Sequence, residues 1–231
     1  MNGWHAALLA IVLLVAGCSA PLRENHLATK DVEVMDKELI ASAERGDTAA
    51  IREWLDRGAD IDAQDAQGRT AIMAATYADK PEAVRLLIEA GADIHKQDLM
   101  QNNPFLYAGA EGLLEIVKLL IEAKADTRLT NRYGGVAIIP ASEKGHVETV
   151  RTLLEETDVD VNHVNQLGWT ALLEAIILSD GGTKHQQIVR LLLDHGADAN
   201  LADNEGVTPL QHAKRKGFAE IERMLVDAGA R

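Results

Sequence analysis

Aromatic residues are scarce in this chain: three tryptophans, three tyrosines and two phenylalanines make up 3% of its 231 residues. Apolar residues still account for 47%, so general disorder is excluded and any packed core is mainly aliphatic. Cysteine occurs once, at Cys18. A single cysteine excludes an intramolecular disulfide framework and a structural zinc site built from several cysteines.

Basic residues are fewer than acidic ones: there are 23 Lys and Arg and 36 Asp and Glu, which give a formal net charge of −13. A chain of this charge repels phosphate backbones and anionic lipid surfaces, so nucleic acid is not expected as a partner. A partner with a basic patch is the complementary hypothesis.

Common catalytic motifs are absent: there is no Gly-x-x-x-x-Gly-Lys phosphate loop, no His-Glu-x-x-His and no Gly-x-Ser-x-Gly. The eight histidines are scattered, and His146 follows Gly145 as a turn residue would. We therefore expect no enzyme, no cofactor and no metal site. A metal pair of His163 and His195, and catalysis from an unrecognised site, are the alternatives.

The N-terminus contains an apolar run, Ala6 to Ala16, and no charged side chain other than His5 before Cys18. Eleven residues are too few to span a bilayer but suit the hydrophobic region of a secretory signal peptide. The following Leu14-Val15-Ala16-Gly17-Cys18 resembles the lipobox of bacterial lipoproteins. The resemblance implies a signal peptide over 1–17 and a lipid-modified Cys18 as the mature N-terminus. The alternatives are an ordinary signal peptide or a buried helix with an inert thiol.

Ser19 follows the cysteine, and by the same resemblance a residue other than aspartate implies the periplasmic face of the outer membrane. A soluble periplasmic protein is the alternative. Residues 18–35, which contain Pro21 and mixed charges but no sustained period, are expected to form the lipidated N-terminus and a tether. Such a tether could extend to roughly 55 Å, or could form a short helix near its end.

The rest of the chain is repetitive. Gly-Ala-Asp or a variant of it recurs with its aspartate at 60, 93, 126, 160 and 198, at spacings of 33, 33, 34 and 38 residues. Two further markers keep step with it: a Gly-x-Thr sequence such as Gly68-Arg69-Thr70, and an aliphatic stretch such as Val84 to Ile88. A fixed period of this length indicates a stack of similar units.

These markers resemble the ankyrin repeat, whose pattern is Asp-x-x-Gly-x-Thr-Pro-Leu, two helices and then Gly-Ala-Asp. The resemblance implies an all-α repeat fold, an α-solenoid with β-hairpin loops, of about six copies over 36–231. Their expected bounds are 36–63, 64–96, 97–129, 130–163, 164–201 and 202–231. Thr70, Thr170 and Thr208 are placed to cap first helices, and Gly58, Gly91 and Gly196 to end second helices.

Three copies depart from the pattern. Copy three has Gln101 and Asn103 in place of the turn glycine and threonine, and Lys124 in place of the helix-ending glycine. Copy four has Val136 for threonine and Pro140 inside its first helix, which predicts a shortened or kinked helix. Copy five has about five extra residues around 179–185, read either as a harmless loop or as an added contact finger.

Ankyrin repeats bind partners on a concave face made of hairpin tips and first helices, so the resemblance implies a protein partner there. Tyr77, Glu111, Glu143, Lys144 and Ile177 are first-helix positions on that face. Of all candidates, Tyr77, Arg132, Tyr133 and Trp169 are the strongest, because interfaces favour aromatic and Arg anchors. The partner-binding candidates are Gln67, Arg69, Tyr77, Met100, Asn102, Arg132, Tyr133, Gln166, Trp169 and Glu205.

Together these features predict a non-catalytic binding module in the periplasm, monomeric apart from its partner and touching the membrane through lipid only. The module would act as a scaffold or protective partner of a periplasmic enzyme. An immunity protein that neutralises a periplasm-targeted toxic enzyme such as a lipase is the alternative function.

Overall fold

The computed structural model describes residues 22–231, with side chains from residue 31 onward. The predicted signal peptide and Cys18 lie outside the described residues. Helices account for most of the described chain. Their bounds are α1 Leu22–Arg45, α2 Thr48–Asp56, α3 Ala71–Tyr77, α4 Pro81–Glu89, α5 Pro104–Glu111, α6 Leu114–Glu122, α7 Ile138–Glu143, α8 Val147–Glu156, α9 Ala171–Ile177, α10 Thr183–Asp194, α11 Pro209–Lys216 and α12 Ala219–Asp227.

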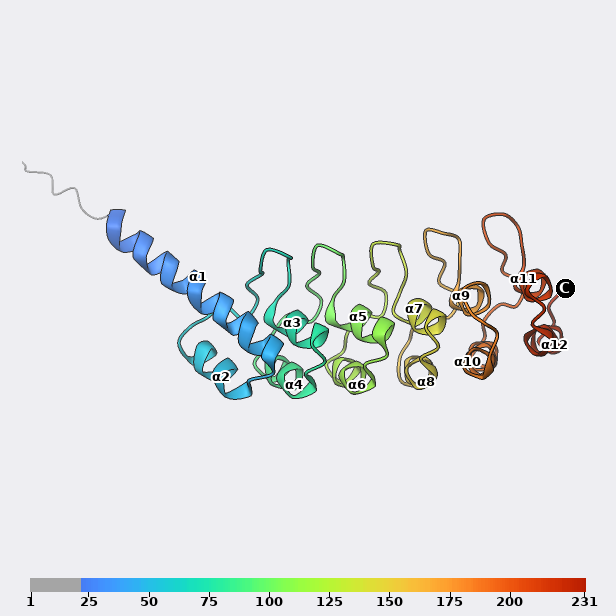
Figure 1. The fold of residues 1–231 in the computed structure, drawn as a ribbon, viewed down its shortest axis with the longest axis horizontal. Helices are drawn as coiled ribbons and strands as arrows, with labels where there is room; N and C mark the ends of the chain where they lie inside the picture. Colours follow the sequence, from blue (N-terminus) through green and yellow to red (C-terminus); the bar gives the residue numbers. More distant parts are fainter. Residues whose placement is uncertain (1–21) are drawn as a thin grey trace, which may run out of the picture.

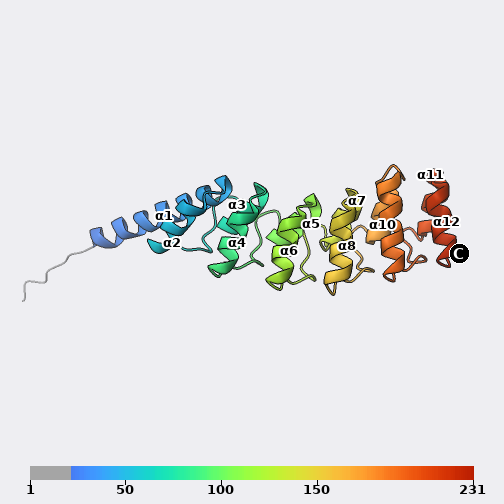
Figure 2. The same cartoon turned by 90° about the horizontal axis from the view of Figure 1, so that it is seen from below.

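The helices form two layers of an elongated stack (Figure 1). Each first helix, from α3 to α11, packs against the first helix of the next copy, and the second helices from α2 to α12 pack likewise. Figure 2 shows the second-helix layer from below, with α4, α6, α8 and α10 side by side. A continuous aliphatic core joins the layers, as the scarcity of aromatics requires; Phe105 is the large aromatic side chain fully buried within it.

Local sequence signals account for the helix ends. The hydroxyl oxygens of Thr70, Thr170 and Thr208 accept hydrogen bonds from the backbone N–H three residues on, which confirms them as N-caps. Asp60 accepts a hydrogen bond from the backbone N–H two residues on, and the equivalent aspartates of the later copies do the same, so these aspartates hold turns. Gly58 takes the left-handed conformation that ends α2 at little steric cost.

The N-terminal end differs from the predicted tether. Helix α1 begins at Leu22 and runs for 24 residues without a break into copy one. The sequence left open an extended tether or a short helix near its end; residues 22–35 are helical and rise by about 1.5 Å each, so the helix occupies most of this segment rather than its end alone. Copy one has no finger, and α1 packs directly on α3.

The loops before the first helices project from the stack as hairpin-shaped fingers (Figure 1). Residues 22–231 contain no β-strand, so the expected β-hairpins are tight turns rather than ladders. Two pairs of neighbouring fingers are joined by single backbone hydrogen bonds: the N–H of Leu99 donates to the Gln67 carbonyl, and that of Gln166 to the Tyr133 carbonyl. The Gln97 side-chain amide also donates to the Thr130 carbonyl at 2.9 Å, so fingers two to five are joined in a row.

In the irregular copies, other residues take over the roles of the missing threonine and glycines. Asn103 caps α5 with a 2.8 Å bond from the Leu106 N–H, while Gln101 and Lys124 adopt the left-handed conformation of the glycines they replace. Helix α7 has six residues and no side-chain cap, as Val136 and Pro140 predict.

The insertion in copy five is divided between a short loop and an added helical turn. Helix α10 begins at Thr183 and has 12 residues, where α4 and α6 have nine. Residues 183–185 are therefore helical rather than part of a loop, and a contact role for the insertion stays a prediction. No helix within 22–231 has the length and apolarity to cross a bilayer.

Candidate functional site

The fingers and first helices together form one long surface, here called the finger face (Figure 1). Every predicted partner-binding residue lies on this face, with differing exposure. Exposed side chains are Gln67, Met100, Arg132, Tyr133, Gln166 and Glu205. Half-buried side chains are Arg69, Tyr77, Asn102 and Trp169.

Two of the half-buried residues brace the fingers. Arg69 binds Asp65 of its own finger at 2.8 Å and Glu44 of α1 at 3.3 Å. The Tyr77 hydroxyl donates a 2.5 Å hydrogen bond to Asp98 of the next finger. Burial and this carboxylate neighbour raise the pKa of Tyr77 to about 12. These side chains therefore hold the face in shape as well as lining it.

The middle fingers have apolar tips. Leu99 is 75% exposed, Leu167 is 52% exposed and Tyr133 is 51% exposed, and the Met100 side chain is exposed to a slightly smaller fraction. We call these four side chains the apolar tips. Gln67 and Glu205 occupy the corresponding tips in copies two and six, so polar residues flank the apolar centre. Protein interfaces have the same arrangement, an apolar centre with a polar rim.

Arg132 ties two of these tips together. Its guanidinium lies 4.7 Å from the centre of the Tyr133 ring, a cation–π contact, and its Nη1 is 3.4 Å from the Met100 sulfur. Fingers three and four therefore present one joined aromatic and thioether surface.

Two hollows lie on the finger face. One of about 670 Å³ brings together four predicted residues with Asp98 and Leu99, which were not predicted. These four are Gln67, Arg69, Tyr77 and Met100. The other, of about 300 Å³, lies between fingers four and five and is here called the groove pocket. Tyr133 is the one residue of the partner-binding set that lines it; two of the first-helix positions, Glu143 and Lys144, line it too.

The groove pocket contains a feature that the sequence did not indicate, the side chain of Glu174 on α9. It is 5% exposed, and its Oε1 accepts a 2.8 Å hydrogen bond from the Asn165 amide. Burial, together with the nearby Glu143 carboxylate, raises the pKa of Glu174 to about 7. A buried carboxylate with such a pKa marks a candidate functional group.

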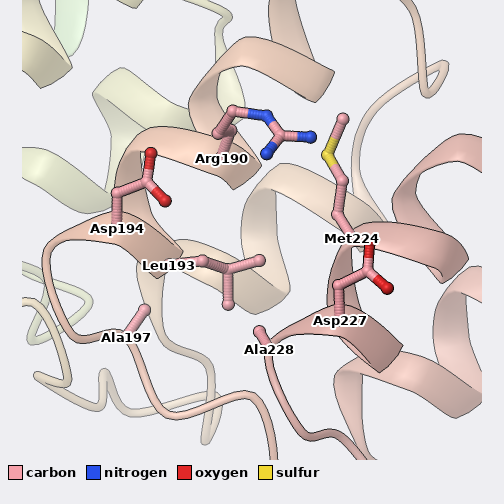
Figure 3. Close-up of a pocket in the computed structure, with 7 residues that line it drawn as sticks. All are labelled: Arg190, Leu193, Asp194, Ala197, Met224, Asp227 and Ala228. Carbon is pink, nitrogen blue, oxygen red and sulfur yellow. The ribbon is translucent and has the colours of Figure 1, made fainter.

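A further hollow lies on the opposite layer, between α10 and α12 (Figure 3). Arg190, Leu193 and Asp194 face Met224 and Asp227 across it. The corresponding residues of α4 and α6 line an equivalent hollow, starting with Arg85, Ile88 and Glu89. Since the same positions recur, this hollow is a product of repeat packing rather than a separate site.

His163 and His195, the hypothetical metal pair, are each engaged by a backbone carbonyl. The Nε2 of His163 binds the Gly134 carbonyl, and the Nδ1 of His195 binds the Leu191 carbonyl, so each ring of the hypothetical metal pair has its own backbone partner. His146 precedes α8, where burial lowers its pKa. Among residues 31–231, whose side chains the structure describes, there is no group of three His, Cys, Asp or Glu arranged for a metal ion.

The fold and the finger face define a helical repeat protein with one long, regular surface. The sequence profile of ankyrin repeats (3 copies) matches residues 38–131, 105–183 and 138–231. The chain belongs to the ankyrin-repeat family, whose repeats bind other proteins and are typically non-catalytic.

Solved structures and known proteins agree with this assignment. An ankyrin repeat domain from Acinetobacter baumannii AYE is 54% identical, with a TM-score of 0.81 over 84% of this chain and 98% of that one. The ankyrin repeat domain of Bcl-3, a member of the IkappaB protein family, is 25% identical, with a TM-score of 0.75 over 84% of this chain and 86% of that one. The ankyrin repeat protein YahD of Escherichia coli (strain K12) is 54% identical over 77 residues, which are 33% of this chain and 38% of YahD.

Proposed function

We propose that this chain is a periplasmic, lipid-anchored ankyrin protein that binds another protein on its finger face, as scaffold or protective partner of a periplasmic enzyme. One observation carries the binding role: the apolar tips stand exposed at the centre of a row of hydrogen-bonded fingers. A preformed surface loses little conformational entropy on association, which favours docking without rearrangement. The anchor rests on the lipobox-like sequence at Cys18.

Charge supports a basic surface on the partner. The chain carries a formal net charge of −13, so oppositely charged patches would speed association and make it sensitive to salt. Binding that does not weaken as salt is raised would contradict this part of the proposal.

Affinity capture with the detergent-solubilised full chain tests the function. Tyr133→Ala with Leu167→Ala removes two apolar tips and should abolish most capture of the specific partner identified by mass spectrometry. Val34→Ala with Val226→Ala is the matched control, since these side chains are similarly exposed but lie on α1 and α12, outside the fingers. Equal loss in both variants, or in neither, would reject the finger face as the docking surface.

The captured partner also separates the two biological roles. A housekeeping periplasmic enzyme that is more stable with the chain than without it supports the scaffold. A secreted toxic enzyme whose turnover stops on binding would instead make the chain an immunity protein.

A further inference from the structure

The groove pocket combines apolar walls with a carboxylate at its floor. Helix α7 contributes Ile139 and Pro140 to the walls, the tip of finger five contributes Leu167, and the end of α9 contributes Leu178. Glu174 reaches the pocket from α9 and is almost wholly buried. Apolar walls around an acid suit a ligand with a hydrocarbon body and a positively charged end.

Glu174 has no cationic partner, although a histidine and an acid are paired at the equivalent position in copy six. In copy six that position holds His212, whose Nε2 lies 2.7 Å from Asp203 of its own finger, pairing an imidazole with an acid. In copy five the acid is on the helix and the finger supplies the neutral Asn165. No ion pair reaches Glu174 from the described part of the chain, and its Oε2 has no hydrogen-bond partner there.

The charged groups around Glu174 do not neutralise it. On α7, Glu143 adds a second carboxylate, while the Lys144 ammonium is held 2.6 Å from Glu111. On α10, the Nε2 of His185 is 2.9 Å from the backbone carbonyl of Glu143. On α11, the Lys216 ammonium donates to the carbonyls of Ile177 and Ser179, and His212 is held by Asp203. Neither Glu143 nor Glu174 forms an ion pair in the described part of the chain, so the pocket is acidic whenever Glu174 is ionised.

We propose that the groove pocket receives a lysine side chain of the protein partner. The four methylene groups of lysine would pack against Ile139, Pro140, Leu167 and Leu178, and its ammonium would meet the free oxygen of Glu174 beside Glu143. Long cationic side chains bury their hydrocarbon stems in this way. The inference rests on the proposed binding function and assigns the basic residue of the partner to one place on the finger face.

The probe for this site is Nα-acetyl-L-lysine N-methylamide, titrated into the full chain in detergent and followed by the methyl NMR signals of Ile139, Leu167 and Leu178. The norleucine analogue, which has the same hydrocarbon stem without the ammonium, is the matched probe. We expect saturable shifts of these methyl signals with the lysine probe and weaker binding of the norleucine probe by about tenfold.

Two variants complete the experiment. Glu174→Gln keeps the shape and should weaken the lysine probe by about tenfold while leaving the norleucine probe unchanged. Glu115→Gln removes the same charge from the exposed surface of α6 and should change neither probe. Because an ammonium favours the ionised acid, binding should also tighten as pH rises from about 6 to about 8 in the wild type and not in Glu174→Gln.

Equal binding of the two probes, shifts confined to other residues, or no saturation would overturn the inference. Stronger binding of the matching arginine derivative would assign the pocket to arginine instead and overturn the choice of lysine. If the lysine probe fails while the apolar tips remain essential for capture, the pocket proposal falls and the binding function stands. If the probe binds while the tips are dispensable, the function proposal falls instead.

Discussion

Glu174 shows how one residue can oppose the stability of its own copy. A buried carboxyl group is tolerated readily in its neutral form, and ionising it inside the core requires free energy. The pKa of Glu174 is about 7 in the folded chain, against an ordinary value of 4.5. Between these pH values the folded chain therefore holds a proton that the unfolded chain has already released. The free energy of unfolding therefore falls as pH rises from 4.5 to about 7 and is unaffected by this group above that range.

The Glu174→Gln variant should remove this loss. Glutamine keeps an oxygen for the Asn165 amide and never ionises, so its stability relative to wild type should rise by about 3 kcal/mol between pH 4.5 and pH 8. Urea unfolding at both pH values measures the difference. Glu115→Gln should show no such trend, and a Glu174→Gln difference that is the same at both pH values would contradict the assigned pKa.

Residue identity at the tips was only partly predictable from sequence. Counting back one residue from the turn glycine in the four copies that have one gives Gln67, Tyr133, Leu167 and Glu205, whereas the prediction for copy five named Gln166 and Trp169. The regular spacing thus contained the signal for Leu167. Glu174 carried no signal, because its burial depends on how α7 and α9 fit together, and that fit is a property of packed copies rather than of one segment.

At the scale of elements, a glycine allows the first helices α5 and α7 to approach closely. Gly109 on α5 faces Ala137 at the start of α7, and a Cβ atom built on this glycine would lie 2.8 Å from the Ala137 Cβ. That separation is shorter than a van der Waals contact. The absence of a side chain at Gly109 therefore sets the spacing between copies three and four.

Gly109→Ala should consequently lower the free energy of unfolding, by about 1–3 kcal/mol, although alanine normally stabilises a helix relative to glycine. Thermal or urea unfolding followed by circular dichroism measures the change. Ala137→Gly in the same chain should recover part of the loss by making room for the new methyl group. A stabilised Gly109→Ala single variant would show that α5 and α7 are not in close contact.

Most helices were predictable because their signals are local. Threonine caps, glycine ends and an aliphatic period each act within one copy, so the repeat pattern located them, including the short α7 with Pro140. The exceptions depend on longer-range packing. Helix α1 extends back to Leu22, and the insertion of copy five adds a turn to α10, although neither segment carries a clear helical start in the sequence.

For the whole molecule, the lipid anchor at Cys18 remains a prediction from the lipobox-like sequence. Each buried methylene group of an acyl chain contributes about 0.8 kcal/mol, and two chains hold a protein firmly to a membrane. Cys18→Ala should therefore abolish incorporation of labelled palmitate and move the protein out of the membrane fraction. Tyr133→Ala, which leaves the anchor intact, should stay in that fraction, and an unchanged distribution of Cys18→Ala would reject the anchor.

Continuity along the stack depends on a ladder of hydrogen bonds between copies. Asp62 accepts from the Asp93 N–H at 2.9 Å, His95 from the Asp126 N–H at 3.1 Å, and Asn162 from the Asp198 N–H at 2.8 Å. At the equivalent position of copy three stands Arg128, a side chain without an acceptor, which binds Asp126 instead. The ladder is broken between copies three and four, where the sequence is least regular.

This break leaves the backbone N–H of Asp160 without an acceptor, since nothing in the described part of the chain accepts a hydrogen bond from it. Its hydrogen exchange should be at least about tenfold faster than that of Asp93 or Asp198, which one lost hydrogen bond would produce. NMR-detected exchange on the full chain measures the three amides together. Arg128→Asn, which restores an acceptor, should slow Asp160, while Asn162→Ala should speed Asp198 and leave Asp93 unchanged. Protection of Asp160 equal to that of Asp93 in the wild type would mean that another acceptor closes the ladder and that copies three and four are coupled as tightly as the rest.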